Sequence, residues 1–267
     1  MRILVTNDDG IDAEGLDSLV RSLSVLSIQG RPAHEIIVVA PDGERSGTSH
    51  AVTLKRPTRL KRLNDGLFSC SGSPADCVIV AGLSVCTAAP DLVISGINRG
   101  PNLGTDIIYS GTCGAARQAA LSDIPAIAVS CASFVEPLDY GCCAEFVARN
   151  LEALISAWKP GSFVNINGPS SSRLDIPAIW TEPGRNRYFD ALRCFEGADG
   201  FTYCFLADGR HERSGEGMTD HRAVSEGYIS IGLIELHPRK LDQSPFPGSP
   251  FSGNLGGLLN PCSNVPW

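Results

Sequence analysis

The apolar residues of this chain gather in short runs that are apolar throughout instead of alternating with polar residues. Such runs predict strands that are buried on both faces, as in parallel sheets, and the segments between most of them are compatible with helices. The strand runs lie at residues 3–6, 36–40, 92–95, 126–130 and 163–167, and the helical segments at residues 14–26, 74–83, 112–121 and 143–158. This alternation predicts a doubly wound α/β core with a mostly parallel sheet over residues 1–170.

Two regions interrupt the pattern. Residues 53–70 are basic and β-like around a Leu-Asn-Asp-Gly turn at residues 63–66, which predicts an inserted hairpin whose basic residues form a solvated face. After about residue 170 the periodicity weakens, and short strands are expected at residues 179–181, 201–206 and 228–231. We expect a carboxyl-terminal extension over residues 171–242, and a loose tail over residues 243–267, which carry no charged side chain from 243 onward.

Composition excludes several classes of protein. A net charge of −7 and a pI near 5.2 argue against stable binding to nucleic acid, which normally requires a basic face. The first residues lack the apolar stretch of a signal peptide, and no 18-residue apolar run occurs, so we expect a cytoplasmic protein that does not enter membranes. The ten cysteines are scattered without a C-x-x-C pair, which is typical of small buried apolar residues.

The first strand run is followed by Asn7-Asp8-Asp9-Gly10, which places two adjacent carboxylates at a strand end. Paired carboxylates in such a place either repel each other, so that one pKa rises, or share a divalent metal ion. Oxygen ligands suit Mg²⁺, Mn²⁺ or Ca²⁺ better than zinc. The same residues are ordinary turn formers, so this motif alone does not decide between a turn and a metal site.

Three further loops follow predicted strands and would meet Asp8 and Asp9 at the carboxyl ends of a parallel sheet. The loop at residues 40–50 is rich in hydroxyl groups, and residues 95–104 combine three glycines with Asn98 and Asn102. The third loop, at residues 109–117, runs into a helical segment and resembles an anion site made of backbone N–H groups. Its hydroxyls would serve equally well as helix N-caps, and the glycine-rich loop could be a turn without a ligand.

The loops contain neither a Walker A motif nor a G-x-G-x-x-G fingerprint after the first strand, which disfavours a nucleotide-driven motor and a dinucleotide dehydrogenase. Instead, four motifs occur in order: residues 1–10, Glu-Arg-Ser-Gly at 44–47, Gly-Ser-Pro-Ala-Asp-Cys at 72–77, and Ser-Gly-Ile-Asn-Arg-Gly-Pro-Asn at 95–102. Together they resemble the SurE survival-protein nucleotidases. The similarity continues through residues 109–112, recurs at Thr219-Asp220, and covers roughly residues 1–236.

The resemblance implies a metal-dependent phosphomonoesterase, a 5′-nucleotidase that acts on nucleoside 5′- and 3′-monophosphates, with exopolyphosphatase activity in some members. It implies one divalent ion per subunit, Mg²⁺ or Mn²⁺. It also implies a Rossmann-like three-layer core with a carboxyl-terminal hairpin and helix exchanged between subunits in homodimers or homotetramers. Carried over by position, the metal ligands would be Asp8, Asp9, Ser46 and Asn98, and the phosphate-binding residues would be Asn102, Ser110, Gly111 and Thr112.

The resulting hypothesis makes Asp8 and Asp9 the catalytic carboxylates, one of which could also act as a general base. His50 is a candidate acid for the leaving group, although a lone histidine near a turn is more often a packing residue. Two alternatives stay open. The same loops could hold a phosphate without cleaving it, or they could serve another phosphate ester, because nothing in them identifies a base.

Overall fold

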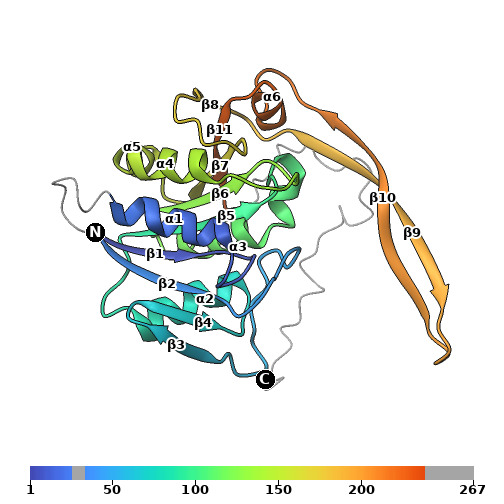
Figure 1. Cartoon of the computed structure of the whole chain (residues 1–267), viewed down its shortest axis with the longest axis horizontal. Coiled ribbons are helices and arrows are strands. Elements are labelled where there is room, and N and C mark those ends of the chain that lie inside the picture. Colours follow the sequence, from blue (N-terminus) through green and yellow to red (C-terminus); the bar gives the residue numbers. More distant parts are fainter. Residues whose placement is uncertain (26–33, 238–267) are drawn as a thin grey trace, which may run out of the picture. The chain divides into compact units, whose positions relative to one another are not determined.

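Strands and helices alternate along most of the chain in the computed structural model, which describes residues 1–25 and 34–237 (Figure 1). Met1–Leu236 form one compact unit. The strands are β1 (Arg2–Thr6), β2 (Glu35–Pro41), β3 (Leu60–Asn64), β4 (Leu67–Cys70), β5 (Leu92–Arg99), β6 (Ala126–Cys131), β7 (Ser162–Gly168), β8 (Ala178–Trp180), β9 (Arg185–Glu196), β10 (Thr202–Ser214) and β11 (Ile229–Glu235). The α-helices are α1 (Glu14–Val25), α2 (Pro74–Val80), α3 (Gly111–Ala120), α4 (Gly141–Arg149), α5 (Leu151–Ala157) and α6 (Asp220–Ser225), joined by the π-helical turn η1 (Ala81–Val85) and the 3₁₀-helix η2 (Gly104–Ile108).

One nine-stranded sheet runs through this unit in the order β3-β4-β2-β1-β5-β6-β7-β11-β8. The neighbours from β4 to β7 pair in parallel, whereas β3 and β11 pair antiparallel with β4 and β7. The predicted α/β class with a mostly parallel sheet is therefore confirmed. Chain order reverses between β1 and β5, because β2 lies on the other side of β1 from β5. Ligands of doubly wound sheets bind outside the carboxyl ends of strands at such a reversal.

Helices cover both faces of the sheet, and strand residues alternate between them. Ile3 and Val5 of β1 point into the apolar cluster formed with Leu19 of α1 and with residues of α4 and α5. Leu4 points the other way, into a second cluster with Cys77 of α2 and residues of α3. Because β1 is buried on both faces, its end at Thr6 is held from both sides, and so is the position of the residues that follow.

The predicted strand runs at residues 3–6, 36–40, 92–95, 126–130 and 163–167 are all strands, and the basic segment contains the predicted hairpin as β3 and β4. The predicted segments at residues 14–26, 74–83 and 112–121 overlap α1, α2 and α3, and residue 26 lies outside the described residues. The predicted helix at residues 143–158 is instead two helices that meet at Asn150. The Asn150 side-chain amide donates to the Phe146 carbonyl, 2.8 Å away, and such a local side-chain bond competes with a continuing helix.

Strand β5 extends beyond its predicted end at residue 95 and continues to Arg99. Asn98 therefore lies on the strand, not in the following loop as predicted. The pairing with β6 shifts register between Ser95 and Asn98, so the strand continues past an irregularity. Gly96 lies there at φ +141°, and a Cβ on it would come within 2.3 Å of the Val129 carbonyl oxygen. The glycine that suggested a loop is in fact what lets β5 pass close to β6.

The carboxyl-terminal extension contributes to two sheets. The strands expected at residues 179–181 and 228–231 correspond to β8 and β11, which complete the main sheet. The strand expected at residues 201–206 is the start of β10, which pairs with β9 in a separate antiparallel hairpin (Figure 1). Strand β9 was not predicted. The predicted tail at residues 243–267 lies outside the described residues, and the domain boundary at residue 170 stays a prediction.

Candidate active site

Asp8 lies at the end of β1 with its side chain against the start of α3. The Thr112 hydroxyl donates a hydrogen bond to Asp8 Oδ1. A Cβ on Gly111 would lie 2.9 Å from Asp8 Oδ2, so the close approach of helix and carboxylate requires a glycine there. Asp8 is only 3% exposed, and Thr112 is fully buried. The structure therefore brings together Asp8, Gly111 and Thr112, which the sequence assigned to the metal and phosphate sites.

Asp9 and Asn98 lie at the neighbouring carboxyl ends of β1 and β5. Asp9 Oδ2 accepts a 2.9 Å hydrogen bond from the backbone N–H of Arg99, the residue that follows Asn98. The Asn98 side-chain N–H donates to the Gly100 carbonyl at 2.8 Å. With its nitrogen engaged in that bond, Asn98 has its Oδ1 as the side-chain atom that can accept or coordinate. A pocket of about 360 Å³ opens beside Asp9 and includes Tyr140 in its wall.

The loop at residues 42–50 reaches the same edge of the sheet through its backbone. The N–H of Arg45 donates to the Asp8 carbonyl at 2.7 Å, and the N–H of Ser49 donates to the Tyr109 carbonyl at 3.0 Å. Ser46 is exposed, and its hydroxyl donates to Glu44 Oε1 at 2.9 Å. The predicted ligand Ser46 therefore follows Arg45, whose backbone contacts Asp8, and lies on the exposed side of the site.

Ser110 caps helix α3, as the simpler interpretation of this loop predicted. Its hydroxyl oxygen accepts the backbone N–H of Cys113 at 3.0 Å. The cap fixes where α3 begins and therefore which backbone N–H groups are left without a partner inside the helix. These groups belong to the first turn, beside Asp8, where they could hold the oxygens of an anion. His50, by contrast, faces Gln118 of α3 at 2.9 Å, as a packing residue would.

Asn102 is held by side chains from β6 and β7 that the sequence analysis missed. Asn165 and Asn167 of β7 both donate to its backbone carbonyl, at 2.9 and 3.1 Å. Asn167 also accepts the Asn102 N–H at 2.8 Å, and the Asn102 side-chain amide donates to Ser130 Oγ at 2.8 Å. All four residues are buried. The signal for this network was present in the sequence, because the predicted strand run at 163–167 contains two asparagines, and polar side chains in a buried strand need partners.

Asp220, at the start of α6, ties this loop to the carboxyl-terminal extension. Its carboxylate accepts the backbone N–H of Gly104 at 2.6 Å, of Gly184 at 2.9 Å and of His221 at 2.8 Å. Asp220 is only 3% exposed. Three charge-assisted bonds to one buried carboxylate position the loop that carries Asn102. Sequence reasoning included Asp220 only as part of the family resemblance, without a role.

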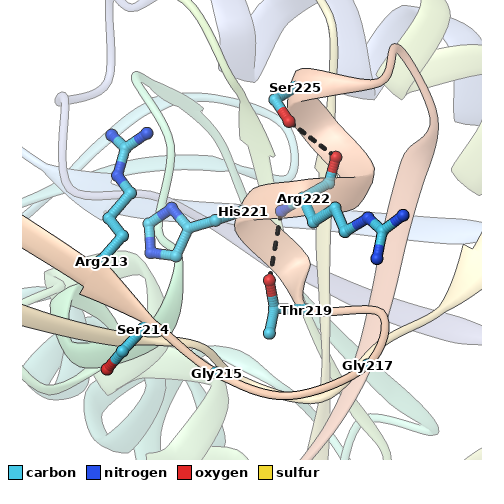
Figure 2. Close-up of a pocket in the computed structure, with 8 residues that line it drawn as sticks. All are labelled: Arg213, Ser214, Gly215, Gly217, Thr219, His221, Arg222 and Ser225. Atoms are coloured by element: carbon cyan, nitrogen blue, oxygen red, sulfur yellow. Dashed lines mark hydrogen bonds between the residues drawn. The ribbon is translucent and has the colours of Figure 1, made fainter.

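A second pocket, of about 390 Å³, lies beside α6, and Figure 2 shows the His221 ring pointing from this helix toward Arg213 and Ser214. The ring packs where a Cβ on Gly104 or Gly184 would come within 3.0 or 2.9 Å of it. Both ring nitrogens are buried and have no hydrogen-bond partner among the described residues. Burial lowers the pKa of His221, which favours the neutral ring. His221 therefore packs against these two glycines as a neutral ring.

Electrostatics at the strand ends favour a cation. Burial raises the pKa of Asp8 to about 6, opposed by the Thr112 hydrogen bond and assisted by the negative charge of Asp9. Burial also raises the pKa of Asp9. A buried carboxylate, a partly buried carboxylate, an amide oxygen and a hydroxyl are hard oxygen donors of the kind that Mg²⁺ and Mn²⁺ prefer. The residues present therefore fit a divalent ion, which would compensate charges that the surrounding protein leaves uncompensated.

The fold and the site together define a doubly wound α/β protein with an acidic, phosphate-compatible centre at its topological reversal. The sequence model described as "Survival protein SurE" matches residues 3–190. The chain belongs to this family, as the sequence motifs indicated.

Curated relatives and solved structures agree with this assignment. The chain is 36% identical over 238 residues to the protein named 5′-nucleotidase SurE from Geotalea daltonii, which covers 88% of this chain and 93% of that relative. It is 40% identical over 244 residues to the protein of the same name from Heliobacterium modesticaldum, covering 88% and 86%. The crystal structure of the SurE protein from Aquifex aeolicus superposes with a TM-score of 0.74 at 29% identity, covering 90% of this chain and 95% of that chain.

Within residues 1–25 and 34–237, no helix has the length and apolar character needed to cross a lipid bilayer. The cytoplasmic location stays a prediction.

Proposed function

We propose that this chain is a metal-dependent phosphomonoesterase that hydrolyses nucleoside 5′- and 3′-monophosphates to nucleoside and phosphate. Hydrolysis of short polyphosphate is proposed as a side activity. The enzyme would use one Mg²⁺ or Mn²⁺ ion per subunit and would act in the cytoplasm as a homodimer or homotetramer. The coarser statement within this proposal, that the chain is a 5′-nucleotidase, is confirmed by the names of its curated relatives.

The observation that carries the proposal is the contact between Asp8 and the first turn of α3. A buried, ionised carboxylate repels an anion, whereas the free N–H groups at the start of a helix attract one. The two groups would therefore not bind a phosphate jointly without a cation. The carboxylates could hold a divalent ion, which would make the charge beside Asp8 positive. Together with the N–H donors of the first turn of α3, this charge would suit a phosphate group.

The donor set proposed for the ion is Asp8, Asp9, Ser46 and Asn98. When bound, a divalent ion supplies charge neutralisation and lowers the pKa of a coordinated water. The residues around it then have separate tasks. Asp9, whose Oδ2 already accepts the Arg99 N–H, is held in orientation by that bond. Asp8 is positioned by the Thr112 hydroxyl.

The proposed phosphate-binding residues are Asn102, Ser110, Gly111 and Thr112. Gly111 and Thr112 would donate their backbone N–H groups to phosphate oxygens from the first turn of α3. Ser110 acts as the cap that fixes this turn. Asn102, which is held by the bonds from β6 and β7, would contribute to the same phosphate site. Transfer of a phosphoryl group needs mainly this positioning and charge stabilisation.

The deciding experiment measures phosphate release from AMP, GMP, 3′-AMP, a sugar phosphate and tripolyphosphate. Each substrate is assayed with Mg²⁺, with Mn²⁺ and with excess chelator. We expect metal-dependent release from the nucleoside monophosphates, and loss of release with chelator that added metal restores. Release that survives chelation would overturn the metal dependence, and equal rates on the sugar phosphate would overturn the nucleotide specificity. Binding of AMP without release would favour a module that holds phosphate without cleaving it.

A further inference from the structure

Two cysteines face each other across the β9–β10 hairpin. Cys194 of β9 and Cys204 of β10 are directly opposite in the antiparallel register. Their sulfurs are in contact, with the Cys194 thiol donating to Cys204 Sγ at 2.7 Å, and both residues are exposed. We call this pair the hairpin dithiol. It lies away from the residues of the candidate active site, and the proposed reaction gives it no task.

The side chains around the hairpin dithiol follow the alternation of a regular ladder. Phe195 and Phe205, each next to a cysteine along its strand, meet on the opposite face with ring centroids 6.1 Å apart. The turn beyond the pair is closed by the Gly197 N–H, which donates to the Phe201 carbonyl at 2.8 Å. Backbone pairing on both sides therefore holds the two cysteines opposite each other.

Cross-strand geometry suits a covalent link. Directly opposed residues of an antiparallel pair have Cα atoms about 4.5 or 5.5 Å apart. Both separations lie within the range of roughly 4.4–6.8 Å that disulfides span. No rearrangement of the backbone is needed to join such a pair.

We infer that Cys194 and Cys204 form a reversible intrachain disulfide, with a low-molecular-weight disulfide such as glutathione disulfide as the oxidant. The bond would staple the hairpin near its turn. The dithiol form would leave the hairpin held by its backbone hydrogen bonds and side-chain contacts alone.

The chemistry proceeds in two exchange steps. One cysteine loses its proton, and its thiolate attacks a sulfur of glutathione disulfide, forming a mixed disulfide and expelling one glutathione thiolate. The second cysteine, also deprotonated, attacks the protein sulfur of that mixed disulfide, forming the Cys194–Cys204 bond and expelling the second glutathione. The two protein thiols lose two electrons, glutathione disulfide gains them, and the two protons end on the two glutathione thiols.

The buried cysteines among the described residues are less accessible to this oxidant. Burial raises the pKa of Cys113 to about 12 and that of Cys131 to about 11, and burial also raises the pKa of Cys143. Cys70 of β4 and Cys77 of α2 are 0% exposed. Thiol exchange requires both a thiolate and access for the attacking disulfide. The hairpin dithiol meets the access requirement on both residues and has its second thiol already in place.

The test uses the full chain and peptide mapping after incubation with glutathione disulfide at neutral pH. Trypsin cleaves after Arg193 and Arg210, so both cysteines fall in one peptide, residues 194–210. We expect this peptide to lose two hydrogen atoms in mass. Additional cleavage after Glu196 should leave the two fragments joined until dithiothreitol is added. Alkylation of the two cysteines should fall about tenfold in the oxidised protein.

Two serine variants serve as matched controls. In Cys194→Ser, we expect Cys204 to carry a stable glutathione adduct and to form no internal link, and Cys204→Ser should behave in the mirror-image way. Both variants should keep the wild-type rate of phosphate release, because the hairpin dithiol lies outside the catalytic residues. The disulfide inference does not require the proposed function, and the retained rate of phosphate release keeps the tests of the two separate.

Three results would overturn the inference. The first is accumulation of glutathione adducts on both cysteines of the wild-type protein without an internal link. The second is a cross-link between two copies of peptide 194–210, which would assign the bond to separate chains. The third is full alkylation of both residues after oxidant treatment.

Discussion

The candidate active site and the β9–β10 hairpin are stabilised by different means. At the site, Asp8, Asn98 and Thr112 are buried at the end of a central sheet whose two faces are covered by helices. On the hairpin, Leu206 and Phe201 are 76% and 68% exposed, and each strand pairs with the other alone. The site is therefore positioned by the whole core, whereas the hairpin depends on its own ladder and on the attachment at its base.

The attachment at the base explains how two such regions coexist in one unit. Asn186, near the start of β9, donates its backbone N–H to the Thr105 hydroxyl at 2.9 Å, and the Tyr188 hydroxyl donates to Asp106. Thr105 and Asp106 belong to η2, which follows the loop of Asn102. These bonds attach the first residues of the hairpin to the core. Four predictions test this contrast, from the largest effect to the smallest.

The largest effect is expected at the centre of the buried region. Asp8→Asn keeps the shape of the side chain and an oxygen that can accept from Thr112, but it removes the charge proposed to hold the metal ion. We expect kcat/KM for AMP with Mn²⁺ to fall by about a thousandfold or more. The control is Asp65→Asn, in an exposed turn, which should keep wild-type activity. Activity within a factor of about three of wild type in Asp8→Asn would exclude Asp8 as a metal ligand.

The same substitution should stabilise the metal-free protein at neutral pH. The pKa of Asp8 is raised to about 6 from its usual 3.8, so the folded state prefers the protonated carboxyl. The stability contributed by protonated Asp8 is therefore lost as the pH rises from about 4 through 6. Above that range, ionised Asp8 lowers the free energy of unfolding by roughly 3 kcal/mol.

We accordingly expect metal-free Asp8→Asn to be more stable than wild type at pH 7.5 and nearly equal to it at pH 4, in parallel denaturant titrations. Added Mn²⁺ should stabilise the wild type and leave the variant unchanged. A variant that is less stable than metal-free wild type at pH 7.5 would contradict the assignment of an uncompensated buried charge.

An intermediate effect is expected where α1 packs on β5 behind the site. A Cβ on Gly15 would lie 2.1 Å from the Ile97 carbonyl oxygen, and backbone cannot yield as a flexible side chain can. Gly15→Ala should reduce the free energy of unfolding by about 2 kcal/mol. The matched control is Gly82→Ala, because nothing lies within 4 Å of a Cβ there. That variant should be neutral or more stable by up to about 1 kcal/mol. Equal stabilities of the two variants would show that α1 and β5 are packed less closely than the contact between Gly15 and Ile97 indicates.

The smallest effect is expected on the hairpin. Leu206→Ser removes an apolar side chain that is already exposed, so the free energy of unfolding should change by less than about 0.5 kcal/mol at low protein concentration. Leu19→Ala, at a fully buried position of α1, should cost about 2–5 kcal/mol in the same assay. A large loss in Leu206→Ser that depends on protein concentration would show that the exposed face has a partner, as subunit exchange implies.

Much of the sheet and the site could be predicted from the sequence because both depend on local patterns. Buried parallel strands are apolar throughout, and their carboxyl ends converge, so Asp8, Asp9 and the loop hydroxyls could be placed together from their positions after strand runs. Asp220 could not be placed in this way. Its bond to Gly104 joins residues 116 positions apart, and no periodicity in either segment specifies that contact.

Strand β9 was missed for a related reason. Residues 185–196 mix Arg, Asp and Glu with aromatic residues, and the segment has no core face to impose a regular alternation. Its strand conformation follows from pairing with β10, which is a nonlocal property. The end of β5 was misjudged because Gly96 and the residues after it are typical of a loop when the neighbouring strand β6 is not considered.

The strand order also determines when the active site can assemble during synthesis. Asp8 emerges from the ribosome early, but β1 pairs with β5, so the carboxylates meet Asn98 only after about 100 residues have been made. The outer edge of β7 stays unpaired until β11, near residue 235, has been added. A nascent chain, or a fragment cut at residue 190, would carry an open and apolar sheet edge, which is a recognised route to aggregation. A chain that ends before β11 therefore exposes the edge of β7 and can aggregate, whereas in a chain that includes β11 this edge is paired.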